Sequence, residues 1–277
     1  MLQAQAKGIR LTGDILRGKA RRFAELQGVV PKQFLSLSNG WLDSFKQRHG
    51  LKQYRFHGEA GKITDGYALR DILNMDETGL NDRIPPDRGL ATAQFAGKKV
   101  DKHRLTYALT TNADGSEVFP PLVIGHARRP RCFQKRSGED LGFDYRWNKK
   151  AWMTGAIFQG YLSNLNAKMK KEGRKVLLLV DNAPSHIFEP ASLTHVRVEF
   201  LDPNMTSRIQ PQDAGVIRAF KAHYRRNFCQ RAISREEAGE VDLYKIDQLQ
   251  AMRLAQEAWD CVTARTVANC WKHAGIL

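Results

Sequence analysis

The chain has 277 residues, of which 42% are hydrophobic and 9% aromatic, a composition typical of a folded globular protein rather than a disordered one. Its 44 Lys and Arg residues outnumber its 29 Asp and Glu residues, and the net charge of +15 favours a polyanionic partner such as nucleic acid. No apolar run approaches the roughly 20 residues of a membrane span, and the four cysteines form no C-x-x-C pair. We therefore expect no membrane association, no zinc site or disulfide framework, and a reducing compartment.

The first sixty residues predict a small helical module. One helix is expected to begin near Thr12 and to end before Gly28 and Pro31, with an apolar face made by Leu16, Ala20, Phe23 and Ala24. A second helix is expected from about Ser38, with Trp41, Leu42 and Phe45 on its apolar side. Residues 1–60 carry eleven Lys and Arg against four Asp and Glu. This pattern fits a helix-turn-helix and fits a plain helical hairpin equally well.

From Arg70 the pattern changes to a mixture of strands and helices. Residues 71–76 predict a short strand ending in an acid, and residues 104–116 and 117–125 predict two strands joined by a turn at Asn112–Gly115. A helix over 152–172, a buried strand over 175–181 and a strand over 196–201 follow. Further helices are predicted over 213–229, 245–260 and 263–274. This order predicts an α/β layered sheet.

Three aspartates occur where these predicted elements begin or end. Asp76 ends the first strand, Asp181 ends the buried strand, and Asp213 opens a helix after Pro211. Strand-end residues face the ligand crevice of an α/β sheet, so these acids can converge. Three carboxylates suit two hard divalent cations about 4 Å apart, which neutralise the attacking and leaving oxygens of phosphodiester transfer. Each aspartate can also be a turn residue or a helix cap, and the pattern leaves both interpretations open.

Longer motifs resemble those of a known family. NMDETGL (74–80), LLLVDNAPSH (177–186) and PNMTSRIQPQDAGVIRAFKAHYRR (203–226) resemble the three catalytic blocks of the pogo, Tigger and jerky transposases, which are DDE enzymes of the mariner superfamily. SNGWLDSFKQRHGLKQYRFHGEAG (38–61) resembles the second helix-turn-helix of the DNA-binding region shared with centromere protein B. The resemblance implies an α/β fold with an RNase H-like mixed sheet flanked by helices, preceded by a small all-α helix-turn-helix module.

The resemblance also implies a division of the chain. Residues 1–61 correspond to the DNA-binding module, which is incomplete by comparison with the family because a further N-terminal helix-turn-helix is usual there. Residues 62–70 are a short linker, and residues 71–277 are the DDE endonuclease domain.

The implied activity is that of a DNA transposase-type endonuclease and strand transferase. By the resemblance Asp76, Asp181 and Asp213 are the catalytic triad and hold two Mg²⁺ or Mn²⁺ ions, while Asn182 and His186 support the site or merely shape a turn. The family releases the element's ends by hydrolysis and joins them to target DNA, typically at TA. The alternative is a domesticated, transposase-derived DNA-binding protein without catalytic activity.

The expected partner is double-stranded DNA, which implies a nuclear protein, and the family also leaves room for a homodimer. Basic side chains in and after the second helix and on the helix after Asp213 are expected to contact phosphates, or else form a solvated basic face. They are Lys46, Arg48, Lys52, Arg55, Lys221, Arg225 and Arg226.

Overall fold

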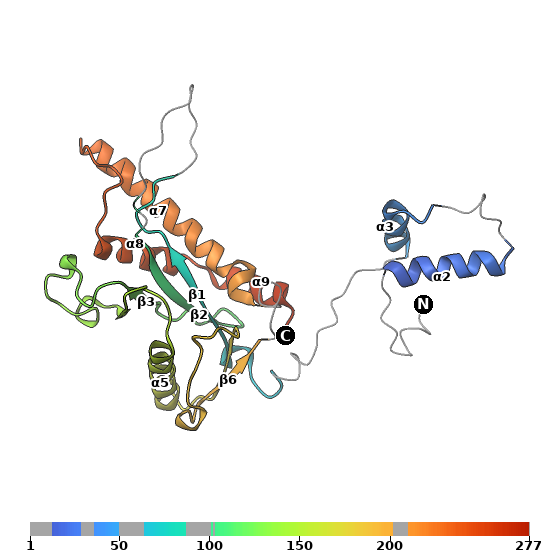
Figure 1. Cartoon of the computed structure of the whole chain (residues 1–277), viewed down its shortest axis with the longest axis horizontal. Coiled ribbons are helices and arrows are strands. Elements are labelled where there is room, and N and C mark those ends of the chain that lie inside the picture. Colours follow the sequence, from blue (N-terminus) through green and yellow to red (C-terminus); the bar gives the residue numbers. More distant parts are fainter. Residues whose placement is uncertain are drawn as a thin grey trace. The chain divides into compact units, whose positions relative to one another are not determined.

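Two units make up the chain, a small helical one and a larger α/β one (Figure 1). The computed structural model describes residues 13–28, 36–49, 64–86, 101, 103–201 and 210–276. The units divide the chain into Met1–Phe56 and His57–Leu277. Within the described ranges, no helix is long and apolar enough to cross a membrane.

The N-terminal unit contains the two predicted helices, α2 (Gly13–Leu26) and α3 (Asn39–Arg48). Ser38 caps α3, because its side chain accepts a hydrogen bond from the Trp41 amide at 3.3 Å. Arg17 ties the helices together by donating to the Leu37 carbonyl at 3.0 Å and to the Asn39 side chain at 2.6 Å. The expected apolar face of α2 is partly wrong. Phe23 is 66% exposed, because α3 approaches the opposite end of α2, at Gly13.

The α/β unit is built on a six-stranded sheet with the order β4-β3-β2-β1-β5-β6. The strands are β1 (Ile72–Leu80), β2 (Leu105–Asn112), β3 (Leu122–Gly125), β4 (Asp144–Trp147), β5 (Val176–Val180) and β6 (Val196–Phe200). The first three form an antiparallel meander, and β5 and β6 lie parallel to β1 on its other side. This is the RNase H-like mixed sheet that the resemblance implied, with β4 added parallel to β3 at the edge.

Helices cover both faces of this sheet (Figure 1). One face packs on α5 (Gly155–Lys171), and the other packs on α7 (Ile217–Glu237), α8 (Gln248–Asp260) and α9 (Ala264–Ala274). Because strand side chains alternate, Leu73 and Met75 of β1 join Phe158 of α5 in one core, whereas Ile72 joins Phe220 of α7 in the other. Short 3₁₀ turns occur at Leu69–Asp71, Arg131–Phe133, Glu139–Leu141 and Pro190–Ser192.

Two features of the sheet differ from the predictions. β1 does not end at Asp76 but continues to Leu80, because residues 77–80 pair with the first half of β2. The edge strand β4 was not predicted. Its sequence, DYRW, alternates polar and aromatic residues, but four residues are too few for this alternation to predict a strand.

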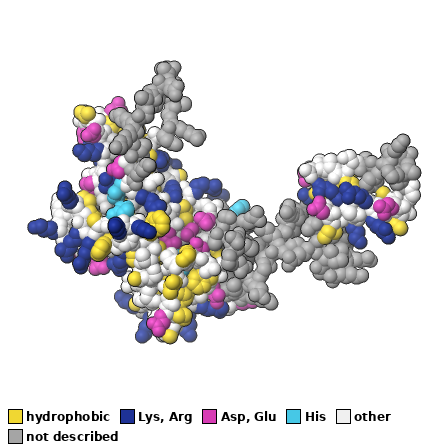
Figure 2. All heavy atoms as spheres, in the orientation of Figure 1, with side chains coloured by type: hydrophobic (Ala, Val, Ile, Leu, Met, Phe, Trp, Pro, Cys, Tyr) yellow, Lys and Arg dark blue, Asp and Glu magenta, His cyan; other side chains and the backbone are white. Residues whose placement is uncertain are grey.

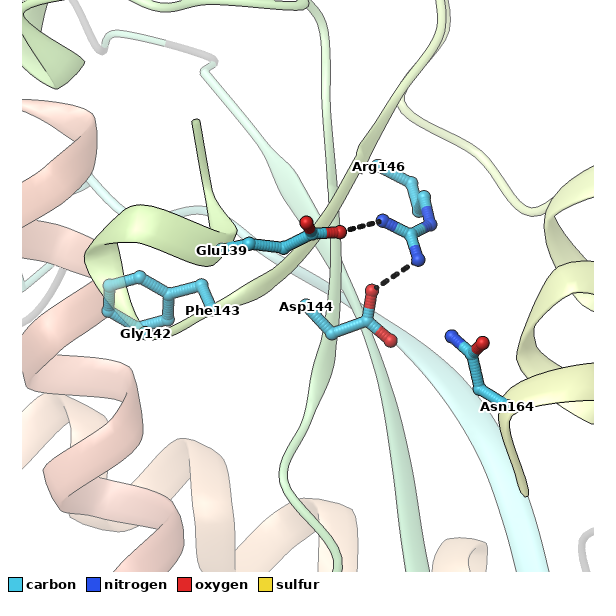
Figure 3. A pocket seen from close by; sticks show the side chains of 6 residues that line it. All are labelled: Glu139, Gly142, Phe143, Asp144, Arg146 and Asn164. Atoms are coloured by element: carbon cyan, nitrogen blue, oxygen red, sulfur yellow. Dashed lines mark ion pairs between the residues drawn. The ribbon is translucent and has the colours of Figure 1, made fainter. Parts of the chain in front are cut away.

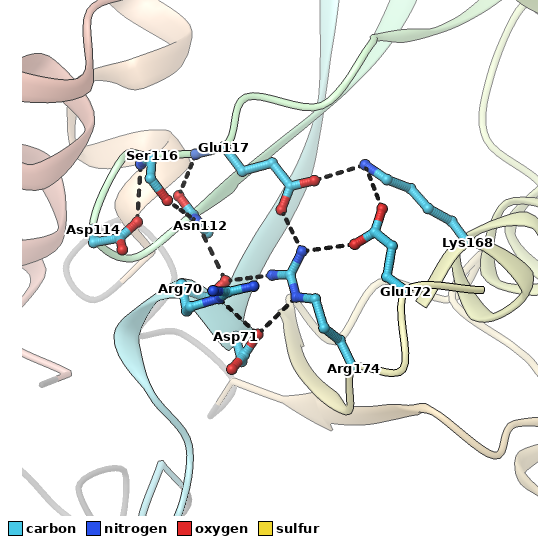
Figure 4. Close-up of polar contacts among 9 residues, drawn as sticks. All are labelled: Arg70, Asp71, Asn112, Asp114, Ser116, Glu117, Lys168, Glu172 and Arg174. Atoms are coloured by element: carbon cyan, nitrogen blue, oxygen red, sulfur yellow. Dashed lines mark hydrogen bonds and ion pairs between the residues drawn. The ribbon is translucent and has the colours of Figure 1, made fainter. Parts of the chain in front are cut away.

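A cluster of ion pairs joins the beginning of β1 to the end of α5 (Figure 4). Arg174 contacts Asp71 at 3.0 Å and both Glu117 and Glu172 at 2.9 Å, and Lys168 contacts Glu117 at 2.6 Å. Burial raises the pKa of Glu117, but the hydrogen bonds from Lys168 and Arg174 outweigh burial and lower that pKa. The cluster therefore stabilises the turn between β2 and β3 while Glu117 is ionised.

Gly115 in that turn lies close to the backbone at the start of α9, and a substitution there tests this contact. Its φ is +75°, and a Cβ added there would lie 2.5 Å from the backbone carbonyl oxygen of Ala264. We expect Gly115→Ala to lower the free energy of unfolding by about 2–4 kcal/mol, from the left-handed backbone and the clash together. Denaturant unfolding measures this.

Gly142→Ala is the matched control for this prediction. Gly142 has a φ of +84°, but a Cβ there meets nothing within 4 Å, so only the conformational cost of about 1 kcal/mol is expected. Equal losses in the two variants would contradict the predicted clash with Ala264.

Candidate active site

The pairing of β1 with β5 sets the first two aspartates side by side. These strands are parallel, and they pair Ile72 with Leu177 and Asn74 with Leu179. The same register, continued two residues beyond the last pair, would place Asp181 opposite Asp76, and the charge of Asp181 raises the pKa of Asp76. Both aspartates alternate with residues of the α5 core, so they face the side of the sheet that carries α7 and α9.

The third aspartate comes from a segment that crosses this face. Asp213 lies in the segment Gln212–Val216, which is kinked at Gly215 and leads into α7. It is exposed, and its charge raises the pKa of Asp76, so the two carboxyl groups lie near each other. The structure therefore brings together the three aspartates that the sequence singled out.

Among the described residues Asp76 and Asp213 have no ion-pair partner, whereas Asp181 contacts His186 at 2.8 Å. Asp76 is 8% exposed, and burial, followed by the negative charges of Asp213, Glu77 and Asp181, raises its pKa to about 8. Burial also raises the pKa of Asp213. Asp76 therefore retains its proton near neutral pH. A carboxyl group whose pKa is raised by burial and by neighbouring negative charges is a suitable ligand for a hard divalent cation, because the cation supplies the missing positive charge.

His186 is clamped between two carboxylates at the edge of the same cluster. Its Nδ1 lies 2.8 Å from Asp181 Oδ1 and its Nε2 lies 2.9 Å from Glu77 Oε1. The ring is buried and stacks on Phe158 with 4.5 Å between centroids. Burial lowers the pKa of His186, but the hydrogen bonds with Asp181 and Glu77 outweigh burial and raise it to about 10. The same contact with His186 lowers the pKa of Asp181.

Ligand atoms of Glu77, Asp181 and His186 lie within 4.8 Å of one another, close enough to surround a metal ion. However, each nitrogen of His186 faces a carboxylate, so the ring is an imidazolium with no lone pair to offer. Glu77 alternates with Asp76 and belongs to the α5 side of the sheet. Among the described residues, Asp76, Asp181 and Asp213 do not form such a close group, so their role as cation ligands stays a prediction. Neither Glu77 nor its contact with His186 was predicted, since 109 residues separate the two.

The other residues singled out in the sequence lie in different places. Lys221, Arg225 and Arg226 are exposed on α7, and Arg225 donates to the Ile84 carbonyl at 2.8 Å. Asn182 is exposed immediately after Asp181. In the N-terminal unit, Arg48 is exposed and Lys46 pairs with Asp43 at 3.4 Å. Lys52 and Arg55 lie outside the described residues.

Three residues near Lys221 were missed in the sequence, namely Arg104, Lys150 and Trp152. Burial lowers the pKa of Lys221, while the charges of Asp76 and Asp213 oppose that effect and the charge of Arg104 adds to it. Arg104 in turn lies 5.6 Å from the ring centroid of Trp152, and Lys150 lies 5.5 Å from the same centroid. The space-filling view shows Lys and Arg side chains around a small acidic patch on the α/β unit (Figure 2).

A pocket of about 390 Å³ lies at the opposite edge of the sheet, by β4 and α5 (Figure 3). Its lining includes Arg146, which pairs with Glu139 at 3.5 Å and with Asp144 at 3.0 Å. Since β2 and β3 separate β4 from β1, this pocket is not part of the acidic site.

Two family models match the chain. The model described as DDE superfamily endonuclease matches residues 102–271, and the one described as Tc5 transposase DNA-binding domain matches residues 1–55.

Curated relatives match nearly the whole chain. Tigger transposable element-derived protein 4 of Mus musculus is 32% identical, over 98% of this chain and 55% of that protein. Major centromere autoantigen B of Homo sapiens is 29% identical over 99% and 50%, respectively. CENP-B homolog protein 2 of Schizosaccharomyces pombe is 30% identical over 96% and 56%. The chain thus spans about half the length of these relatives. Among solved structures, a mariner Mos1 paired end complex with Mg is 14% identical with a TM-score of 0.43, over 96% of this chain and 77% of that one.

Proposed function

The chain belongs to the DDE superfamily of endonucleases, in its pogo and Tigger branch, and from this premise we propose that it cleaves DNA and transfers strands at its three-aspartate site. The observation that carries the proposal is the convergence of Asp76, Asp181 and Asp213 from three segments far apart in the chain. Turn or cap roles alone would not require Asp181 and Asp213 to lie close enough to raise the pKa of Asp76.

The carboxylates fit a pair of Mg²⁺ or Mn²⁺ ions, which when bound would neutralise charge on the attacking and leaving oxygens of a phosphodiester. Asp76, Asp181 and Asp213 would hold these ions, and the proton that Asp76 retains would leave on binding. His186 would not bind the ions. Its imidazolium balances Glu77 and holds the Asp181 carboxylate in one orientation.

Double-stranded DNA is the proposed substrate, as element ends and TA-containing target. We propose that residues 1–61 form the DNA-binding module, through Lys46, Arg48, Lys52 and Arg55, and that 62–70 link it to the nuclease of residues 71–277. Lys221, Arg225 and Arg226 of α7 would contact phosphates near the scissile bond. Relatives that include a centromere autoantigen support a nuclear location, and a homodimer would allow two ends to be joined.

The group formed by Arg104, Trp152 and Lys150 extends this proposed DNA path away from the acids. If Lys150 contacts a phosphate, Lys150→Ala should reduce the slope of log affinity against log salt by about 1. Electrophoretic retardation of a short duplex at several salt concentrations measures that slope. Lys170→Ala is the control, since Lys170 is an exposed lysine in the last turn of α5. Equal slopes for both variants would remove Lys150 from the DNA path.

The proposal is tested by incubating the purified chain with supercoiled plasmid and Mn²⁺, with and without a chelator. Nicking that requires Mn²⁺ supports the nuclease. Retardation of DNA without nicking, equal in the presence and absence of metal, would replace it with the second candidate, a domesticated DNA-binding protein. That candidate is favoured by the likeness to Major centromere autoantigen B.

A further inference from the structure

One neutral side chain, that of Asn74, is connected to all three segments that carry the aspartates. Asn74 is fully buried in β1, two residues before Asp76 and on the same face of the strand. Its Nδ2 donates to the carbonyl of Leu179 at 3.0 Å, in β5 two residues before Asp181. Its Oδ1 accepts from the backbone amide of Gln212 at 2.9 Å, immediately before Asp213.

The segment that carries Asp213 is attached to β1 by further bonds from Gln212. The Gln212 side chain is fully buried and donates to the Asn74 carbonyl at 3.2 Å and to the Thr111 hydroxyl at 3.2 Å. Asn74 and Gln212 therefore bind each other through both side chains and through backbone groups. This pair anchors Gln212, the first residue of the segment Gln212–Val216, to β1 in the centre of the sheet.

The amide of Asn74 supplies both the hydrogen-bond donor and the hydrogen-bond acceptor that this position needs. The Leu179 carbonyl requires a donor, and the Gln212 amide requires an acceptor, and an asparagine side chain offers one of each. An apolar residue would leave both backbone groups unpaired in the core. An aspartate would keep the acceptor but turn a carboxylate oxygen toward the Leu179 carbonyl.

We propose that Asn74 is a positioning residue that sets the distance of Asp213 from Asp76 and Asp181, and so the size of the metal site. The proposal rests on the proposed function, because it concerns the same three acids. Asn74 touches none of the reacting groups itself and acts through the backbone of Gln212 and Leu179.

Asn112 provides a matched control within the same sheet. It is also fully buried, in the neighbouring strand β2, and its side chain contacts the Arg70 carbonyl at 3.3 Å, Ser116 Oγ at 2.9 Å and the Glu117 amide at 3.0 Å. Its partners belong to the turn between β2 and β3 and to the start of β1, and none is next to an aspartate of the site. Replacing Asn112 therefore removes a comparable set of bonds without loosening the segment that carries Asp213.

The experiment compares Asn74→Ala with Asn112→Ala in the full chain, using Mn²⁺ affinity from electron paramagnetic resonance, thermal melting, and plasmid nicking against Mn²⁺ concentration. Both variants should melt at lower temperature. Only Asn74→Ala should weaken Mn²⁺ binding, by about 10–100-fold, and raise the Mn²⁺ needed for half-maximal nicking by a similar factor. If Asn74→Ala does not fold, Asn74→Ser replaces it, since the shorter hydroxyl side chain cannot reach both the Leu179 carbonyl and the Gln212 amide and should weaken Mn²⁺ binding in the same direction.

Mn²⁺ affinity in a folded Asn74 variant equal to that of Asn112→Ala would overturn the positioning role. Asp181→Asn, measured in parallel, separates this failure from that of the proposed function. If wild type and Asp181→Asn bind Mn²⁺ equally, the metal site itself is wrong, and the role of Asn74 fails with it.

Discussion

Asp181→Asn is expected to lower Mn²⁺-dependent plasmid nicking by about 10³-fold or more. The substitution keeps the shape of the side chain but removes the negative charge that lies beside Asp76 across the β1–β5 pair. Charge stabilisation by bound metal is worth several kcal/mol in such reactions, and about 4 kcal/mol corresponds to a factor of 10³ in rate. The measurement is the initial rate of conversion of supercoiled to nicked plasmid.

Asp144→Asn is the matched control for the loss of activity. Asp144 lies in the same unit, is half-buried, and burial likewise raises its pKa, but it belongs to the edge strand β4. We expect this variant to nick at the wild-type rate. Unchanged nicking in Asp181→Asn would contradict the site assignment, and a similar loss in both variants would attribute the effect to folding.

His186→Gln is expected to lower the free energy of unfolding by about 3–5 kcal/mol at neutral pH, because removing one partner of a buried ion pair leaves the other uncompensated. The glutamine retains one hydrogen bond at most to Glu77 or Asp181, and it has no positive charge. Metal affinity or nicking should fall by about 10–100-fold, since Asp181 loses the group that orients it. Denaturant unfolding and Mn²⁺ titration measure the two effects.

The pH dependence of the free energy of unfolding should show whether the positive charge of His186 causes this loss of stability. Its pKa is raised from 6.5 to about 10 on folding, so its contribution is complete below about pH 6.5 and is lost as pH rises through 10. The raised pKa of Asp76 also makes stability fall with pH, but only up to about pH 8. Between pH 8 and 10, therefore, metal-free wild type should lose stability by up to about 1.4 kcal/mol per pH unit, and His186→Gln should lose less.

His103→Gln is the comparison for this series. It removes another contact between a histidine and a buried aspartate, 2.7 Å to Asp82, at a position beyond the end of β1. Nicking should persist in this variant. If wild type and His186→Gln lose stability in parallel between pH 8 and 10, the imidazolium assigned to His186 is wrong.

Local pattern predicted the elements that carry the site. The apolar run before Asp181 predicted a strand buried on both faces, and Val176–Val180 is fully buried between the two helical layers. Helix predictions succeeded where caps were present, as at Thr154 for α5 and Thr263 for α9. Both signals depend on neighbours within a few residues, which a sequence displays directly.

Partners that are distant in the sequence could not be predicted in the same way. The register that sets Asp181 beside Asp76 spans 105 positions, and no residue type encodes an offset between parallel strands. Asn74 looked like one polar residue in an apolar strand, because its partners Leu179 and Gln212 are known only from the fold. His186 likewise looked like a residue of a turn, since the carboxylate that clamps its Nε2 comes from Glu77.

The raised pKa of Asp76 has a consequence for how such a gene changes over time. Because this pKa rises to about 8 on folding, Asp76 costs the metal-free fold stability at neutral pH, and we expect Asp76→Asn to be stabilising. Stabilising substitutions accumulate readily once the activity they damage is no longer under selection. A copy that had long ceased to cut DNA would be expected to lose this aspartate early.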